Sequence, residues 1–240
     1  MALRILDTGI ASAEENMRLD ERLLDELDAE GAPILHFYQW AGLSATYGYF
    51  TLPEKHLDLG MVKKHQVNLA RRPTGGGIVF HIWDLAFSFL MPSGHPRYSL
   101  NTLENYRFVN ESVLEVMRTF FSLKEPLEII PQDVPQLGLD CHNFCMAKPT
   151  RYDVVYQGMK IAGAAQRRRK QGYLHQGTIS LALPQFELLS EVLLSKNEVL
   201  EAMRAYSFAP VGRIPGLGSL DEVRPEIQKL LSFHLMEKLQ

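Results

Sequence analysis

The sequence predicts an α+β fold in which helices flank a mixed, mostly antiparallel sheet. Strand-like runs stand next to one another along the chain, while the helical stretches are mostly terminal or flank groups of strands. This order argues against a doubly wound sheet, and no internal repeat is visible. The chain has 240 residues, 46% of them hydrophobic, which is enough for one large domain.

The first half of the chain is expected to start with a helix and to continue mainly as strands. Residues 11–28 carry apolar side chains at helical spacing, and Ser12 followed by Glu15 fits a capping box. Residues 102–121 form a second, long amphipathic pattern. Between these helices we expect strands at 33–39, 45–50, 78–81 and 85–91, and a short helix at 54–65.

The second half is expected to contain three neighbouring antiparallel strands. Residues 152–156, 159–165 and 178–183 alternate in the manner of strands, and Gln157-Gly158 is typical of a tight turn between the first two. The other expected elements are a strand at 128–130, an irregular segment at 131–148, helices at 188–206 and 222–238, and a Gly/Pro-rich connector at 212–218. We therefore expect a single domain over residues 1–240 with a helical C-terminal tail at about 185–240.

Composition and charge exclude several classes of protein. The net charge of −3 and the isolation of the basic run 167–170 argue against a nucleic-acid partner. No apolar stretch approaches the roughly 20 residues of a membrane span, and the N-terminus has no signal-peptide layout. Two cysteines do not make a disulfide framework, so we expect a reducing cytoplasm. A monomer is the default expectation.

The glycine-rich stretch at residues 71–81 is the most informative part of the sequence. Three consecutive glycines, Gly75 to Gly77, let the backbone adopt positive φ angles and approach a ligand closely. Arg71 and Arg72 stand just before them and favour phosphate or carboxylate groups. An apolar strand-like run and His81 follow. We interpret the stretch as a ligand-binding loop, with a simple tight turn as the alternative.

Lys160 and His175 are the next candidates. Lys160 begins an apolar strand, where it can either face solvent or place a compact positive charge against a developing negative charge. His175 precedes the expected strand at 178–183, where a histidine acts either as a structural hydrogen-bonding residue or as a ligand contact.

Cys145 lies in the irregular segment, together with Cys141 and His142. The spacing of these residues is not that of a zinc knuckle and no second ligand pair is visible, so we expect no metal site. Cys145 is a candidate nucleophile because a cysteine in an irregular loop can be exposed and activated. An inert buried thiol is the alternative for both cysteines.

Taken together and in this order, these motifs resemble those of a known family. The loop Arg71-Arg72-x-x-Gly75-Gly76-Gly77-x-Val79-Phe80-His81 resembles the signature loop of the lipoate–protein ligase A family. The segment 160–166 resembles the catalytic-lysine strand of these ligases, 174–178 resembles the strand after it, and 15–20 resembles their first helix. The resemblance spans about residues 7–183 and extends to the biotin/lipoate ligase superfamily, which includes cysteine-dependent octanoyltransferases.

The resemblance implies a biotin/lipoate ligase-like catalytic domain that transfers an acyl group to a lysine of a lipoyl domain. Acceptors of this kind occur in 2-oxoacid dehydrogenase E2 subunits and in the glycine-cleavage H protein. The ligase reaction uses ATP and Mg²⁺ to convert lipoate into lipoyl-AMP before transfer. Lys160 is then the catalytic residue, and the residues implied to bind substrate and adenylate are Arg71, Arg72, Gly75, Gly76, Gly77, Val79, His81, Gly163, Ala164, His175 and Gly177.

Several positions depart from the ligase pattern. Ile82 replaces the usual aspartate after the loop histidine, Thr51 replaces a glutamine, and no separate accessory domain is expected after the core. Cys145 resembles the cysteine of the octanoyltransferases, which carry the acyl group as a thioester and need no ATP. We therefore favour an ATP-dependent lipoate ligase, with an octanoyltransferase acting through Cys145 and a non-catalytic binder of lipoyl domains as alternatives. A biotin ligase has less support because its Gly-Arg-Gly-Arg loop has no counterpart.

Overall fold

The computed structural model describes residues 2–121, 127–131, 141, 143–211 and 217–240. His142, part of the expected irregular segment and residues 212–216 of the expected connector lie outside these ranges. The main sheet has seven strands in the order β1-β2-β6-β10-β9-β8-β7. Their bounds are Arg4–Ala11 (β1), Ile34–Trp40 (β2), Asp84–Pro92 (β6), Gly172–Ser180 (β10), Met159–Arg169 (β9), Val154–Tyr156 (β8) and Leu127–Ile129 (β7).

The predicted α+β class is confirmed. Only β1 and β2 pair in parallel, and every other neighbouring pair of this sheet is antiparallel. The seven-stranded sheet therefore has the mixed, mostly antiparallel character that the order of strand-like runs predicts.

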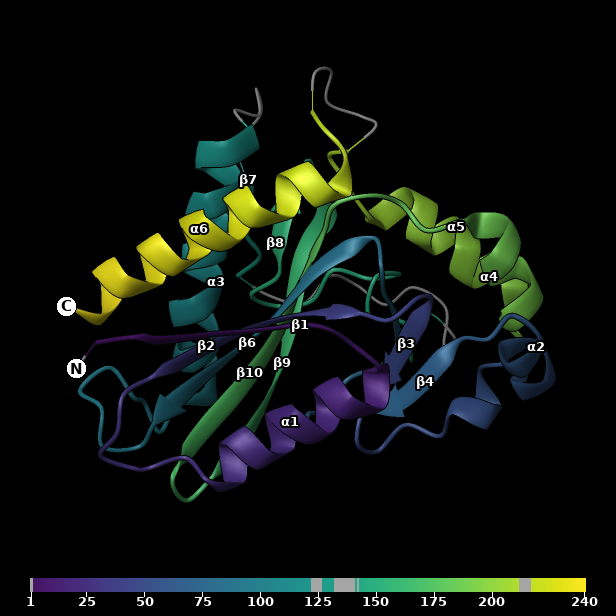
Figure 1. The fold of residues 1–240 in the computed structure, drawn as a ribbon. Coiled ribbons are helices and arrows are strands. Elements are labelled where there is room, and N and C mark those ends of the chain that lie inside the picture. Colours follow the sequence, from purple (N-terminus) through teal and green to yellow (C-terminus); the bar gives the residue numbers. More distant parts are fainter. Residues whose placement is uncertain (1, 122–126, 132–140, 142, 212–216) are drawn as a thin grey trace.

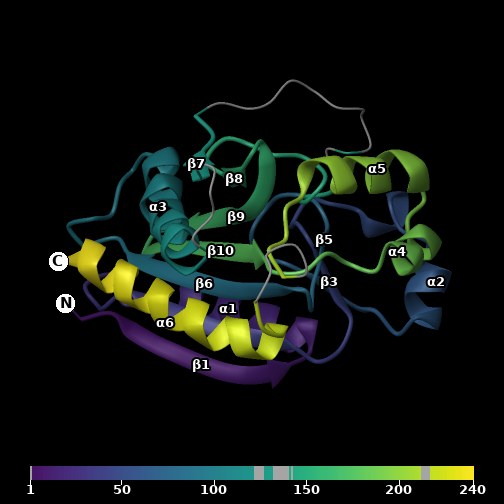
Figure 2. The same cartoon turned by 90° about the horizontal axis from the view of Figure 1, so that it is seen from above.

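Helices cover both faces of the main sheet (Figures 1 and 2). α1 (Ala13–Asp25) lies on one face, and α3 (Thr102–Phe121) lies on the other face with α6 (Leu220–Leu239). The capping box of Ser12 and Glu15 is present at the start of α1. α6 belongs to the core, because Val223, Ile227 and Leu231 are buried in the same cluster as the apolar face of α3.

A second, smaller sheet lies at one end of the main sheet (Figure 1). Its strands are β4 (Asn68–Arg71), β3 (Ser44–Tyr47) and β5 (Val79–Phe80) in that order, and β4 and β5 bracket the glycine loop in the sequence. A separate apolar cluster joins this sheet to three short helices beside it, which are α2 (Leu59–Lys64), α4 (Phe186–Val192) and α5 (Lys196–Tyr206). A 3-10 turn, η1 (Pro53–Lys55), precedes α2 and has no buried residue.

Three strands differ from the sequence-based expectation, and the helix expected at 188–206 is divided into α4 and α5. β4 was not predicted, because its four residues lead directly into the glycine loop. β1 was not predicted, because it is an edge strand that pairs only with β2 and most of its side chains are exposed or half-buried. β10 begins at Gly172, six residues before the expected strand, and pairs without interruption with β6 on one side and β9 on the other. Its polar residues, such as Gln176, form a buried strand because partners elsewhere in the fold satisfy them. No helix of the described residues is long and apolar enough to cross a membrane.

Candidate active site

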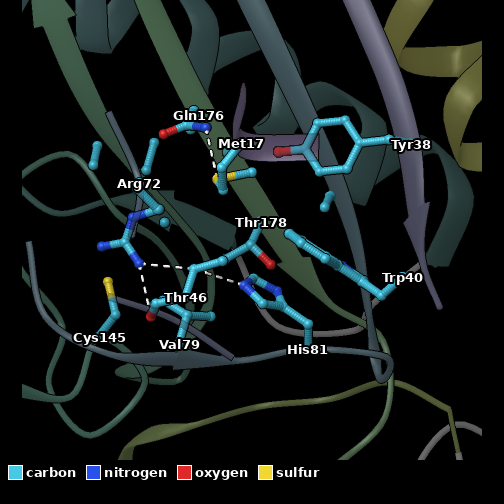
Figure 3. Close-up of a pocket in the computed structure, with 15 residues that line it drawn as sticks. Met17, Tyr38, Trp40, Thr46, Arg72, Val79, His81, Cys145, Gln176 and Thr178 are labelled. Atoms are coloured by element: carbon cyan, nitrogen blue, oxygen red, sulfur yellow. Dashed lines mark hydrogen bonds between the residues drawn. The ribbon is translucent and has the colours of Figure 1, made fainter. Parts of the chain in front are cut away.

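A narrow pocket with about 380 Å³ of empty space lies between the α1 face of the main sheet and the small sheet (Figure 3). Most of its wall is apolar or aromatic, and a few polar groups converge on it, as is usual for small-molecule sites. Figure 3 shows Cys145 at the same end as Arg72, while Trp40 and His81 lie at the other. The lining residues are Met17, Tyr38, Trp40, Thr46, Arg72, Val79, His81, Ala86, Cys145, Gly163, Ala164, Ala165, Gln176, Gly177 and Thr178.

Lys160 contacts Cys145, which borders this pocket, although Lys160 itself is buried and does not line it. The Lys160 Nζ atom lies 3.8 Å from the Cys145 sulfur and 2.8 Å from Asp153 Oδ2. Lys160 is 1% exposed, whereas Cys145 is half-buried and borders the pocket. Burial by itself lowers the pKa of Lys160, but the Asp153 carboxylate and the Cys145 sulfur outweigh that effect and raise it. The lysine is therefore held as an ammonium, which places a fixed positive charge beside the cysteine sulfur.

Asp153 holds the lysine in place. Its Oδ2 atom also accepts hydrogen bonds from the Thr150 backbone N–H at 2.7 Å and from the Thr150 hydroxyl at 2.8 Å. The side chain of Lys160 passes over Gly163, where a Cβ atom would come closer than 3.0 Å to the lysine Cε and Nζ atoms. The glycine in this strand therefore leaves room for the lysine to reach Cys145.

The glycine loop positions the cysteine through backbone hydrogen bonds. The Ile78 N–H donates to the Asn143 carbonyl at 2.6 Å, and the Cys145 N–H donates to the Ile78 carbonyl at 3.0 Å. This pairing needs close approach, because a Cβ on Gly77 would come closer than 3.0 Å to the Asn143 carbonyl. The third glycine is thus explained by contact with the cysteine segment.

Arg72 is buried and braces the glycine loop. Its Nη2 atom donates to the carbonyls of Gly75 and Gly77 at 2.9 and 2.8 Å. Its Nη1 atom donates to the hydroxyl of Thr46 at 2.9 Å and to the Thr46 carbonyl at 3.1 Å. The hydrogen bonds of Arg72 are therefore directed at the protein itself, although the side chain also borders the pocket.

His81 belongs to a hydrogen-bonded chain along the pocket wall. Thr46 Oγ1 lies 2.9 Å from His81 Nε2, and His81 Nδ1 lies 2.7 Å from Asp84 Oδ2. Burial by itself raises the pKa of Asp84, but the facing His81 and the hydroxyl of Thr178 outweigh it and lower that pKa. The Asp84 carboxylate is the acceptor for the Nδ1–H group of His81. Trp40 stacks on the imidazole with ring centroids 4.0 Å apart.

Ile82 takes no part in the hydrogen bonds around His81. Ile82 stands where the ligase pattern has an aspartate, and it adopts a positive φ of 85°. Asp84, two residues later, makes the carboxylate contact with His81 instead.

The other predicted site residues divide into two groups. Val79, Gly163, Ala164 and Gly177 line the pocket together with Arg72 and His81. Arg71 does not line it, but is exposed against the ring of Tyr49, with Cζ 4.7 Å from the centroid. Gly75, Gly76 and Gly77 are likewise absent from the pocket wall.

His175 lies on the face of the main sheet that α3 covers. It packs against Phe87 and Tyr106, and its Nδ1 atom lies 2.8 Å from Gln166 Nε2. Burial lowers the pKa of His175 to about 3, so the ring is neutral at ordinary pH. The structure therefore corrects the sequence-based placement of this residue in the pocket.

Sequence reasoning missed several pocket residues and the partner of Lys160. Asp153 could have been found from the tight turn at Gln157-Gly158, which pairs the strands on either side of it. Tyr106 of α3 lies close enough to interact electrostatically with Cys145, Asp153 and Lys160, and burial raises the pKa of Tyr106 to about 12. No signal in the sequence places the wall residues Met17, Tyr38, Trp40, Thr46 and Gln176 together, because they come from four separate elements. Among the described residues, no cluster of three His, Cys, Asp or Glu side chains could hold a metal ion.

Comparison with known proteins defines the class to which this fold and pocket belong. The chain matches the Lipoyl protein ligase A/B catalytic domain family over residues 12–226. Because the match covers most of its length, the chain belongs to this family of the biotin/lipoate ligase superfamily, and it is an enzyme of that superfamily.

Two relatives of known class are octanoyltransferases. The chain is 34% identical to the octanoyltransferase LipM of Geobacillus kaustophilus over 201 residues, which is 81% of this chain and 70% of the relative. It is 31% identical to the octanoyltransferase LipM of Staphylococcus aureus over 209 residues, 85% of this chain and 74% of the relative.

Solved structures of lipoate ligases share the fold. A bi-partite lipoate protein ligase from Thermoplasma acidophilum, described with its E2 lipoyl domain, superposes with a TM-score of 0.74 at 27% identity over 98% of this chain and 84% of that one. A lipoate-protein ligase A bound with ATP gives a TM-score of 0.72 at 27% identity over 98% and 86% of the chains.

Proposed function

We propose that this chain is a cysteine-dependent octanoyltransferase that moves an eight-carbon acyl group from a thioester donor to a lysine of a lipoyl domain. The contact between Cys145 and Lys160 at the pocket is the observation that carries the proposal. It supplies a nucleophilic sulfur and a fixed positive charge at one place. The octanoyltransferase relatives support the same assignment.

In the first half-reaction, the Cys145 thiolate attacks the carbonyl carbon of the donor thioester. The tetrahedral oxyanion forms beside the Lys160 ammonium, which stabilises it. Collapse breaks the bond to the donor sulfur, which leaves as a thiol after it takes up a proton. Asp153 acts as a positioning residue, because it holds the ammonium without touching the acyl group.

In the second half-reaction, the neutral amine of the acceptor lysine attacks the Cys145 thioester. An amide bond forms, the Cys145 sulfur leaves, and the amine gives up one proton. We propose lipoyl domains of 2-oxoacid dehydrogenase E2 subunits or of the glycine-cleavage H protein as acceptors. A free thiol at Cys145 suits a reducing compartment such as the cytoplasm.

The pocket suits an apolar chain. Tyr38 and Trp40 contribute to its wall away from Cys145 (Figure 3), and Ala86 also lines the pocket. Each buried methylene of a bound chain is worth about 0.8 kcal/mol. That binding energy can hold the thioester carbonyl at the sulfur.

The thioester route explains features that an ATP-dependent ligase leaves unused. The donor is already activated, so no adenylate is needed. Arg72 is committed to the glycine loop and to Thr46, and residue 82 is not an aspartate. The ligase reaction with lipoate, ATP and Mg²⁺ remains the competing outcome, because solved lipoate ligases share the fold.

Intact mass spectrometry tests the proposal. The purified protein is mixed with octanoyl carrier protein, and a lipoyl domain is added in a second step. We expect an octanoyl adduct on Cys145 that disappears as the lipoyl domain gains one octanoyl group. Cys145→Ala should abolish both, whereas Cys141→Ala, at a buried thiol outside the pocket, should abolish neither.

Two results would overturn the proposal. Modification of the lipoyl domain only with lipoate, ATP and Mg²⁺ would establish the ligase. Binding of the lipoyl domain without turnover under either condition would establish a non-catalytic binder.

A further inference from the structure

Two arginine side chains gather on one aromatic ring beside the glycine loop. The guanidinium carbons of Arg71 and Arg167 lie 4.7 and 4.5 Å from the centroid of the Tyr49 ring. Arg71 ends β4 and Arg167 lies near the end of β9, where its Nη1 atom donates to the Pro73 carbonyl at 2.8 Å. Within the described part of the chain, neither arginine has an ion pair. Two unneutralised cations held together favour an anion.

A polar groove with about 870 Å³ of empty space begins at Arg71 and Tyr49 and runs along α1. It also contains two carboxylates, but both already face cations. Glu14 lies 2.5 Å from Arg18. Glu21 lies 3.9 Å from Arg169, which it shares with Asp25 at 3.4 Å. The charge left without a partner at this end of the groove is therefore positive.

The groove continues the reaction pocket. Met17 and Arg72 line both, and Figure 3 shows Cys145 at the Arg72 end of the pocket. Gly163, which the Lys160 side chain crosses, and Arg167 lie on the same face of β9 because four residues separate them. At the rise of a strand, four residues span about 13 Å. A donor with its thioester at Cys145 can thus extend to the two arginines.

We propose that Arg71 and Arg167 bind the phosphate at the far end of the pantetheine arm of the acyl donor, in a site that rests on the proposed thioester chemistry. The arm joins sulfur to phosphorus through roughly 13 bonds, and an extended chain of that length spans about 15 Å. Arginine is suited to phosphate because its guanidinium donates in a planar fork. The acceptor lysine carries no phosphate and is too short for this distance.

Two donors that differ only in the phosphate test the site. Octanoyl-pantetheine and octanoyl-4′-phosphopantetheine are compared by the kcat/KM for acylation of Cys145. We expect the wild-type protein to favour the phosphorylated donor about tenfold, with the advantage falling as salt is added. The double variant Arg71→Gln/Arg167→Gln should lose this ratio. Arg168→Gln, at the next position of β9 and bonded to the Leu100 carbonyl, should keep it.

Direct binding keeps the inference separate from the proposed function. Calorimetry on Cys145→Ala should show tighter binding of 4′-phosphopantetheine than of pantetheine, and the arginine double variant should lose the difference. If this holds while wild-type protein acylates with neither donor, the phosphate site stands and the transferase proposal fails.

Other outcomes overturn the inference itself. One is an unchanged ratio of kcat/KM between the two donors in the arginine double variant. The other is a loss of rate confined to the transfer from Cys145 to the lipoyl domain, which would assign the arginines to the acceptor. Octanoyl-coenzyme A and octanoyl carrier protein share the phosphate, and the donor with the larger arginine-dependent advantage identifies its source.

Discussion

Replacing Asp153 by asparagine should destabilise the fold by about 3–5 kcal/mol, because it leaves the buried ammonium of Lys160 without its carboxylate. The two side chains are only 1% and 4% exposed, and their charged atoms are 2.8 Å apart. The lysine can escape this cost by losing its proton. From an ordinary pKa of 10.5, neutralising it at pH 7 costs 3.5 units of about 1.36 kcal/mol each, or about 5 kcal/mol. Whether the lysine stays charged or loses its proton, the expected loss of unfolding free energy falls in the same range.

Urea unfolding followed by circular dichroism measures the loss. If the lysine of Asp153→Asn is neutral in the folded state, the unfolded chain binds one proton more, so stability rises with pH. The deficit should then shrink by about 1.4 kcal/mol for each unit between pH 7 and 10. The double variant Lys160→Met/Asp153→Leu should recover most of the stability, yet remain inactive. As a control, Arg18→Gln breaks the exposed pair with Glu14 and should cost less than about 0.5 kcal/mol.

A loss below about 1 kcal/mol in Asp153→Asn would refute this account of the site. The account would also fail if the losses in Lys160→Met and Asp153→Leu simply added up in the double variant. A coupled pair requires a large interaction energy between the two positions.

Three further predictions concern single positions. Because burial lowers the pKa of His175 from 6.5 to about 3, the folded state should lose stability as pH falls from about 6.5 towards 3, and His175→Gln should flatten that slope in acid unfolding curves. Gly77→Ala should displace Asn143 and slow acylation of the cysteine about a hundredfold in single-turnover mass spectrometry, whereas Gly75→Ala, which meets open space, should stay within about twofold. Gly163→Ala should slow acylation to a similar extent by displacing the buried lysine, and should lower the free energy of unfolding in urea by about 1–3 kcal/mol. An unchanged acylation rate in Gly77→Ala or in Gly163→Ala would contradict the role given to that glycine.

Strong local patterns were the part of the fold that the sequence could predict. The capping box at Ser12 and the long apolar stripe of α3 appear in the structure at the expected places. β1 escaped prediction because an exposed edge strand needs no apolar alternation. β10 was predicted too short because Gln176 looks like a loop residue, although Thr74 and Asp20 satisfy it inside the fold.

The family follows from the sequence alone, because the glycine loop and the Lys160 strand are contiguous motifs. For two pairs of consecutive residues, Arg71 with Arg72 and His175 with Gln176, only the tertiary structure decided which of the two side chains enters the site. Side chains of a strand alternate between faces, so Arg72 borders the pocket while Arg71 points outward, and Gln176 lines it while His175 packs under α3. The meeting of Cys145 with Lys160 likewise depends on long-range backbone pairing with the glycine loop, which no local pattern encodes.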